Sequence, residues 1–233
     1  MRHPTAHAVA EFAAASRVPV INGGDGSNEH PSQALLDLYT IRSELRASGR
    51  GIDRLRIAMV GDLRHGRTVH SLCKLLGLFD NVQVVLVSPR ELSMPEAIVA
   101  ALRDAGHEVL ESDELEASIA HVDIVYSTRI QEERFQSREE ADLYRGRFRL
   151  NQAVYTRHCE PNTVIMHPLP RDSRDSAREL DDDLNDNPNL AIFRQTDNGL
   201  TVRMALFALM LDVVDQVAAY ATKVTWYTGL RAP

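Results

Sequence analysis

The chain is poor in the residues that would place it in several classes of protein. Its 233 residues include only two cysteines, Cys73 and Cys159, which are too few for a disulfide framework and are typical of a reducing compartment. Cysteine and histidine do not occur at zinc-ligand spacings, and no apolar run is long enough to cross a bilayer. Because Met1 to Pro4 lead directly into an amphipathic segment without a signal peptide, we expect a cytoplasmic protein. The net charge of −7 disfavours a nucleic-acid partner.

Apolar segments of strand length alternate with amphipathic segments of helical period along the chain. This alternation predicts an α/β fold with an open, mainly parallel sheet flanked by helices on both faces. Strands are expected at residues 18–22, 55–60, 82–87, 108–110, 122–126 and 163–166. Helices are expected at residues 5–16, 31–48, 67–76, 95–105, 115–120 and 200–221. The last helix is apolar on most sides, which predicts that it is buried.

Two charged segments give weaker signals. Residues 132–160 look helical but carry little apolar stripe, so part of this segment is expected to be a loop. Residues 171–190 are rich in Asp, Asn, Arg and Ser, which indicates a surface loop or a short helix.

A proline-rich loop follows the apolar run at 163–166. In His167-Pro168-Leu169-Pro170-Arg171 the two prolines donate no backbone N–H and hold φ near −65°, so the loop exposes fixed carbonyl oxygens. Polar segments also follow the runs at 18–22, 55–60, 82–87 and 122–126. Because ligands of open α/β sheets bind at the carboxyl ends of the strands, a site is expected at this edge.

Two arginines lie at these strand ends. Arg67 stands at a strand-to-helix turn, where backbone N–H groups and the helix dipole favour an anion. Arg129 and Gln131 alternate after another strand and could bind a second anionic group. Alternatively, each arginine pairs with a local acid such as Asp62 or Glu132. Because polar residues follow three predicted strands, a ligand site is favoured over local pairing of the arginines.

His30 and Gln33 lie three residues apart at a helix start, so both can face one pocket. The imidazole can donate to a carbonyl oxygen, and the Gln33 amide can either donate or accept. Taken alone, the pair is better interpreted as a capping histidine and a surface glutamine. The preceding Gly23–Gly26 segment matches neither the Walker nor the dinucleotide pattern and indicates a tight turn.

Residue patterns for nucleophilic catalysis are not evident. The sequence shows neither a Ser/His/Asp nor a Cys/His arrangement, and no carboxylate pair stands at a plausible site. The available chemistry is orientation and charge stabilisation, which suits transfer of an already activated group.

Five segments together resemble the aspartate carbamoyltransferases. They are Gly24–Gln33, Val60–Ser71, Thr128–Arg134, His167–Arg171 and Gln195–Arg203. The sibling ornithine carbamoyltransferases have a cysteine in a His-Cys-Leu-Pro loop, where this chain has proline, and their amino-acid site lacks the Arg-x-Gln pair. The resemblance therefore favours aspartate as the substrate.

The resemblance implies transfer of the carbamoyl group of carbamoyl phosphate to the amine of L-aspartate, a step of pyrimidine biosynthesis, without cofactor or metal. It implies that Arg2 and His30 are catalytic and polarise the carbamoyl oxygen, with Arg2 also reaching the phosphate. It assigns Gln33 and the carbonyls of Pro168 and Leu169 to the carbamoyl amine.

The same resemblance assigns the aspartate carboxylates to Arg67, Arg129 and Gln131. The departing phosphate can take the amine proton, so no protein base is required. The implied partners are the two substrates, identical subunits in a homotrimer, and a regulatory chain.

The resemblance also predicts how the chain divides. Residues 1–17 would be a remnant of the carbamoyl-phosphate domain, residues 18–200 the aspartate domain, and residues 201–233 a helix that packs on the first domain. The family's Ser-Thr-Arg-Thr phosphate loop and its Ser/Lys loop are not in this sequence. We therefore expect weak or no activity of this chain alone. The alternatives are a non-catalytic module that binds aspartate or a partner, and a transferase for ornithine or another amino acid.

Overall fold

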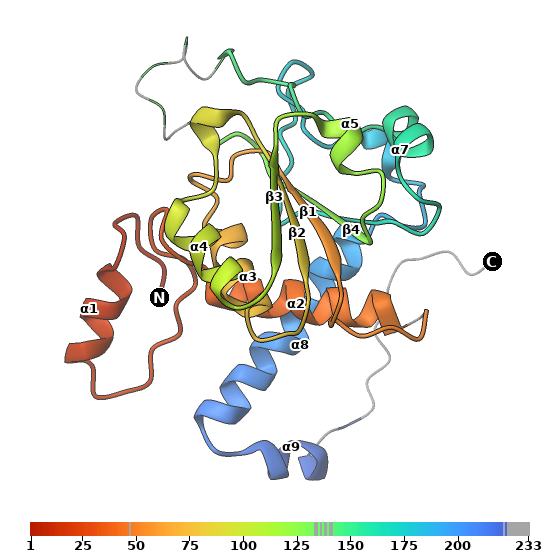
Figure 1. The fold of residues 1–233 in the computed structure, drawn as a ribbon. Helices are drawn as coiled ribbons and strands as arrows, with labels where there is room; N and C mark the ends of the chain where they lie inside the picture. Colours follow the sequence, from red (N-terminus) through yellow and green to blue (C-terminus); the bar gives the residue numbers. More distant parts are fainter. Residues whose placement is uncertain are drawn as a thin grey trace.

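A parallel five-stranded sheet lies at the centre of the chain, in the order β3-β2-β1-β4-β5 (Figure 1). The computed structural model describes residues 1–46, 48–132, 135, 137, 139, 142–220 and 222. The strands are β1 (Arg56–Val60), β2 (Gln83–Val87), β3 (Glu108–Ser112), β4 (Ile124–Ser127) and β5 (Val164–Met166). The predicted class, an open parallel sheet, is confirmed.

Helices cover both faces of this sheet, as the alternating pattern predicts (Figure 1). The helices are α1 (Ala8–Ala15), α2 (Pro31–Arg46), α3 (Arg67–Leu76), α4 (Glu96–Asp104), α5 (Leu115–Ser118), α7 (Gln152–His158), α8 (Ile192–Met210) and α9 (Val214–Tyr220), of which α1 and α9 lie away from the sheet (Figure 1). In β1, Ile57 and Met59 belong to the core formed with α2, α3 and α4. Ala58 and Val60 belong to the core formed with α5 and α7. Successive strand residues therefore serve opposite layers.

The sheet has a topological switch point between β1 and β4. The chain leaves β1 through α3 to β2 on one side, whereas β4 and β5 lie on the other side. The carboxyl ends of β1 and β4 lie side by side, since Val60 pairs with Ser127. Connections that diverge from neighbouring strand ends leave a crevice, which is where α/β proteins bind ligands.

The strand expected at residues 18–22 is wrong. These residues have no regular secondary structure, and Val18 is 68% exposed. A β-branched run indicates strand propensity but not a partner, and Pro19 removes one backbone donor from the run. The segment lies beside the start of the chain, where Gly23 N–H donates to Met1 O at 2.7 Å and His3 N–H donates to Gly24 O at 3.0 Å.

The single buried helix expected at residues 200–221 is also wrong. Helix α8 begins earlier, at Ile192, and ends at Met210. A turn that includes Asp212, whose φ is 55°, separates α8 from α9. The first half of α8 packs on α2 and β5, whereas its second half leads away from the sheet to α9 (Figure 1). Met204, Phe207 and Leu209 are each more than half exposed, although their apolar character predicts a covered surface.

In the charged segment 132–160, α7 is helical at Gln152–His158, and residues 143–148 form turns. Residues 133, 134, 136, 138, 140 and 141 of this segment lie outside the described residues. The expected surface loop at 171–190 includes a short 3-10 helix, Asp182–Leu184, and is anchored by buried leucines 180, 184 and 190. No helix in the described part of the chain is long and apolar enough to span a membrane.

Candidate functional site

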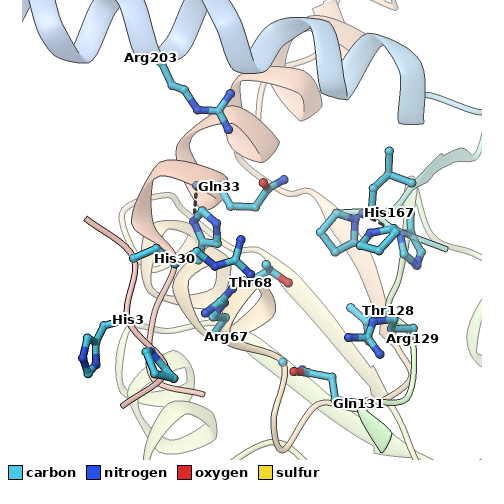
Figure 2. A pocket seen from close by; sticks show the side chains of 16 residues that line it. His3, His30, Gln33, Arg67, Thr68, Thr128, Arg129, Gln131, His167 and Arg203 are labelled. Atoms are coloured by element: carbon cyan, nitrogen blue, oxygen red, sulfur yellow. Dashed lines mark hydrogen bonds between the residues drawn. The ribbon is translucent and has the colours of Figure 1, made fainter. Parts of the chain in front are cut away.

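A cavity of about 600 Å³ opens at the carboxyl ends of β1, β4 and β5 (Figure 2). All eight residues predicted for the site line it: Arg2, His30, Gln33, Arg67, Arg129, Gln131, Pro168 and Leu169. The polar segment after β2, which was also expected at this edge, does not line it. The switch point therefore brings together residues from five separate segments of the sequence.

The cavity is lined by positive charge. Four arginines, Arg2, Arg67, Arg129 and Arg203, contribute to its wall, and the described lining residues include no aspartate or glutamate. Such a wall is suited to a ligand with several negative charges, because planar guanidinium groups bind carboxylate and phosphate bidentately. Within the described ranges, histidine, cysteine, aspartate and glutamate form no group that could hold a metal ion.

The glycine-rich turn makes room for Arg67, the first residue of α3. A Cβ atom added to Gly24 would lie 2.7 Å from the Arg67 Cζ atom, so only glycine allows the guanidinium to lie there. The guanidinium also donates to Gly26 O at 3.2 Å. Buried Asp25 closes the turn by accepting from the Glu29 N–H at 3.2 Å. The predicted tight turn is confirmed, and it supports a cavity arginine.

Gln131 is fixed from the neighbouring loop after β1. Its backbone N–H donates to Asp62 Oδ2 at 3.2 Å, and its side-chain Nε2 donates to His65 O at 2.7 Å. Asp62 is fully buried and also accepts from the His65 N–H at 3.0 Å. These bonds join the β1 and β4 loops across the switch point.

The two acids named as alternative partners of the cavity arginines bind to other groups. Asp62 bonds to His65 and Gln131, as described above. Glu132 forms ion pairs with Arg145 at 2.6 Å and Arg174 at 2.7 Å, and these two hydrogen-bonded guanidinium groups lower the pKa of its carboxyl to about 2.

The His30 side chain both caps α2 and faces the cavity (Figure 2). Its Nδ1 accepts from the Gln33 N–H at 3.2 Å, so in the neutral ring the proton lies on Nε2. Burial, and after it the positive charges of Arg67, Arg2 and Arg203, together lower the pKa of His30 to about 4. At neutral pH the ring can therefore offer an uncharged N–H donor to a ligand oxygen.

We expect the His30 imidazole to titrate near pH 4 in an NMR pH titration of the chain. Arg67→Ala should raise this pKa, because the positive charge of Arg67 disfavours the protonated ring. Arg64→Ala, which removes an arginine outside that set of charges, should leave it unchanged. Titration of wild-type His30 near the ordinary histidine pKa, about 6.5, would contradict the described environment.

The loop after β5 is held by its own histidine. The Leu169 N–H donates to His167 Nδ1 at 2.9 Å. His167 Nε2 lies 2.7 Å from Glu179 Oε1, off the line of a hydrogen bond, and both side chains are buried. The Asp172 N–H donates to Glu179 at 3.2 Å, so this carboxylate restrains the far end of the prolyl loop.

Arg203 is a cavity residue that sequence reasoning missed. It reaches the cavity from α8, and a Cβ at Gly199 would lie 2.6 Å from its Nη1 (Figure 2). A glycine inside a helix costs about 1 kcal/mol relative to alanine, so its presence signals a close approach. That signal was available in the sequence. His3, Thr68 and Thr128 also line the cavity; the two threonines lie in polar segments that follow predicted strands, but no role was predicted for any of the three.

Family models and individual known proteins that match the chain all indicate the same family. The chain matches the family model of the aspartate/ornithine carbamoyltransferase Asp/Orn-binding domain over residues 53–210, and that of the carbamoyl-P-binding domain over residues 1–43. It is 75% identical over 232 residues to the aspartate carbamoyltransferase catalytic subunit of Cellvibrio japonicus, covering 100% of this chain and 69% of that protein.

Solved structures agree with these matches. The catalytic subunit of M. jannaschii aspartate transcarbamoylase is 41% identical, with a TM-score of 0.78, and the match covers 92% of this chain and 66% of that one. The Trypanosoma cruzi aspartate transcarbamoylase in complex with aspartate and phosphate is 36% identical, with a TM-score of 0.77, covering 89% and 62%.

The chain thus spans about two thirds of the length of these relatives, and its matches extend over nearly all of its own residues. The residue patterns, the parallel fold and the comparisons agree. The chain belongs to the aspartate/ornithine carbamoyltransferase family, among the catalytic subunits of aspartate carbamoyltransferase.

Proposed function

We propose that this chain carries the aspartate site and part of the carbamoyl phosphate site of an aspartate carbamoyltransferase. The reaction joins carbamoyl phosphate and L-aspartate to give N-carbamoyl-L-aspartate and phosphate. The observation that supports this most strongly is the cavity at the switch point, lined by four arginines and, in the described chain, by no carboxylate. Both substrates are multiply charged anions, which such a wall attracts.

Aspartate is the substrate that the wall favours. Its two carboxylates match the guanidinium groups of Arg67 and Arg129, and the Gln131 side chain can add a hydrogen bond. Ornithine instead carries an ammonium group on its side chain, which the cavity arginines would repel. The charge of the cavity therefore supports aspartate over ornithine.

The carbamoyl group is activated by donors directed at its oxygen. The amine nitrogen of aspartate attacks the carbamoyl carbon, the bond from this carbon to the bridging oxygen of phosphate breaks, and the departing phosphate takes the amine proton. Negative charge develops on the carbamoyl oxygen, where Arg2 and the Nε2–H of His30 stabilise it. Gln33 and the carbonyls of Pro168 and Leu169 accept from the carbamoyl amine.

We propose a division of the chain into domains, based on the exposed apolar side chains of α8 and α9. We propose that residues 201–233 pack on further residues of a carbamoyl-phosphate domain through a helical arm, which is the second half of α8 together with α9; residues 221 and 223–233 lie outside the described residues. Residues 1–17 would belong to that domain, and residues 18–200 would form the aspartate domain. The exposed Met204, Phe207 and Val217 support this.

The proposal extends to partners and location. We propose a homotrimer with a regulatory chain as a further partner, supported by the family resemblance. We propose a cytoplasmic location, supported by the two free cysteines, Cys73 and Cys159.

Formation of N-carbamoyl-L-aspartate from the two substrates tests the function. The 233-residue chain alone should give weak or no turnover, because the family's phosphate loops are not in its sequence. A chimera that adds the part of the C. japonicus protein which this chain does not match should turn over, and Arg129→Ala in the chimera should abolish turnover. A folded chimera that binds aspartate without turnover would favour the non-catalytic module. Rapid turnover by the 233-residue chain would contradict its dependence on further residues.

A further inference from the structure

Asp37 is a buried carboxylate directly behind the cavity wall. It lies in α2, one turn after Gln33, and is 0% exposed. Its Oδ1 accepts from Gln33 Nε2 at 2.9 Å and from Gln195 Nε2 at 2.6 Å, and its Oδ2 accepts from the Tyr126 hydroxyl at 2.6 Å. Donors from α2, α8 and β4 therefore converge on one side chain.

An ionised carboxylate only accepts hydrogen bonds, so Asp37 fixes which end of each amide faces it. The Gln33 nitrogen points to Asp37, which leaves the Gln33 oxygen for the cavity. The Gln195 nitrogen also points to Asp37, and the Gln195 oxygen accepts from the His167 N–H at 3.0 Å. Asp37 therefore connects a cavity side chain with the start of the prolyl loop.

Burial of this carboxylate opposes its ionisation. Burial raises the pKa of Asp37 to about 6, against the three hydrogen bonds from Tyr126, Gln195 and Gln33, which lower it. An apolar residue of similar volume would avoid this desolvation, so buried charges are weak evidence for stability alone. The geometry instead assigns Asp37 a part in arranging the cavity.

We propose that Asp37 is the positioning residue of the carbamoyl-amine subsite. Through Gln33 it directs a side-chain oxygen into the cavity, and through Gln195 it holds the loop whose Pro168 and Leu169 carbonyls line the same cavity. The Gln33 oxygen and the carbonyls of the loop held through Gln195 then both face one ligand –NH₂ group as acceptors. This inference rests on the proposed function, because it assumes that the ligand carries a carbamoyl amine.

A pair of ligands isolates this subsite. N-carbamoyl-L-aspartate carries an –NH₂ group where N-acetyl-L-aspartate carries a methyl group, and the two are otherwise alike. The wild-type chain should bind the carbamoyl compound at least about tenfold more tightly in isothermal titration calorimetry, because the methyl group leaves the acceptors unpaired. The ratio of the two dissociation constants reports the orientation of the acceptors. It does not depend on the residues that bind the aspartate carboxylates, because both ligands carry these carboxylates.

Asp37→Leu should reduce that ratio to about threefold or less, with binding of N-acetyl-L-aspartate retained within about threefold. Asp37→Asn should keep the preference, since its Oδ1 can face both glutamines and its Nδ2 can donate to the Tyr126 oxygen. If Asp37→Leu does not fold, Gln195→Met cuts only the arm to His167 and should lower the preference partly. Thermal unfolding followed by circular dichroism checks the fold of each variant.

The outcomes separate this inference from the proposed function. An unchanged preference in folded Asp37→Leu or Gln195→Met would overturn the positioning role, and so would an equal loss of affinity for both ligands. Loss of preference in Asp37→Asn as complete as in Asp37→Leu would contradict the orientation mechanism. A wild-type chain that binds neither ligand would instead contradict the proposed function.

Discussion

Replacing Arg129 with alanine should weaken binding of N-carbamoyl-L-aspartate by at least about 30-fold. Arg129 lies directly after β4, is half-buried, and faces a cavity whose described lining includes no carboxylate. A charge-assisted hydrogen bond contributes about 1.5–3 kcal/mol, and a difference of about 2 kcal/mol corresponds to roughly 30-fold in the dissociation constant. Isothermal titration calorimetry with the wild-type and variant chains measures the change.

Arg103→Ala is the matched control, because Arg103 is an exposed arginine on α4 that pairs with Glu111 at 3.1 Å and does not line the cavity. Its affinity should equal that of the wild type. Equal affinities of the wild-type and Arg129→Ala chains would contradict the proposed role of Arg129 in aspartate binding. A parallel loss in Arg103→Ala would show that the effect is one of net charge.

Gly61→Ala should destabilise the chain by about 3–5 kcal/mol, more than an ordinary surface glycine substitution. Gly61 follows β1 with φ of 117°, and an added Cβ would lie 2.2 Å from Thr128 O. Main chain cannot move out of the way as a flexible side chain can, so the β1 and β4 loops must separate. Urea unfolding of both proteins measures the difference in free energy.

Gly106→Ala is the comparison that separates steric overlap from backbone strain. Gly106 has φ of 84°, but an added Cβ would meet nothing within 4 Å. The destabilisation should then be only the cost of alanine in the left-handed backbone region, about 1–2 kcal/mol. Similar destabilisation in both variants would mean that the close approach of Gly61 to Thr128 contributes little.

The parts of the fold that sequence predicted are those whose local pattern and burial agree. The segment at 67–76 has an apolar stripe of helical period and the segment at 82–87 is a nearly continuous apolar run, and the structure has α3 and β2 there. The run at 18–22 has strand propensity but no partner strand, which propensity alone cannot reveal. The helical arm has an apolar surface, but whether a surface is covered depends on what packs against it.

Polar residues that follow strands predicted much of the cavity, although the segment after β2 does not line it. The Arg67 and Arg129 segments and the prolyl loop meet at the switch point, as expected from a parallel sheet. Arg2 came from family resemblance alone, because its approach depends on pairing of residues 1–4 with the 21–26 turn. Arg203 was missed although Gly199, a glycine inside a helix four residues before it, was a signal in the sequence; the structure shows that this glycine leaves space for the Arg203 guanidinium.

Calorimetric titration of the 233-residue chain with two N-carbamoyl amino acids tests the proposed aspartate site most directly. N-carbamoyl-L-aspartate carries the carboxylates that the arginine-lined cavity should bind, whereas L-citrulline is the corresponding product from ornithine. We expect saturable binding of N-carbamoyl-L-aspartate and at least about 30-fold weaker binding of L-citrulline, from loss of one charge-assisted carboxylate contact. Equal or tighter binding of L-citrulline, or no binding of N-carbamoyl-L-aspartate by the folded chain, would contradict an aspartate site in this cavity.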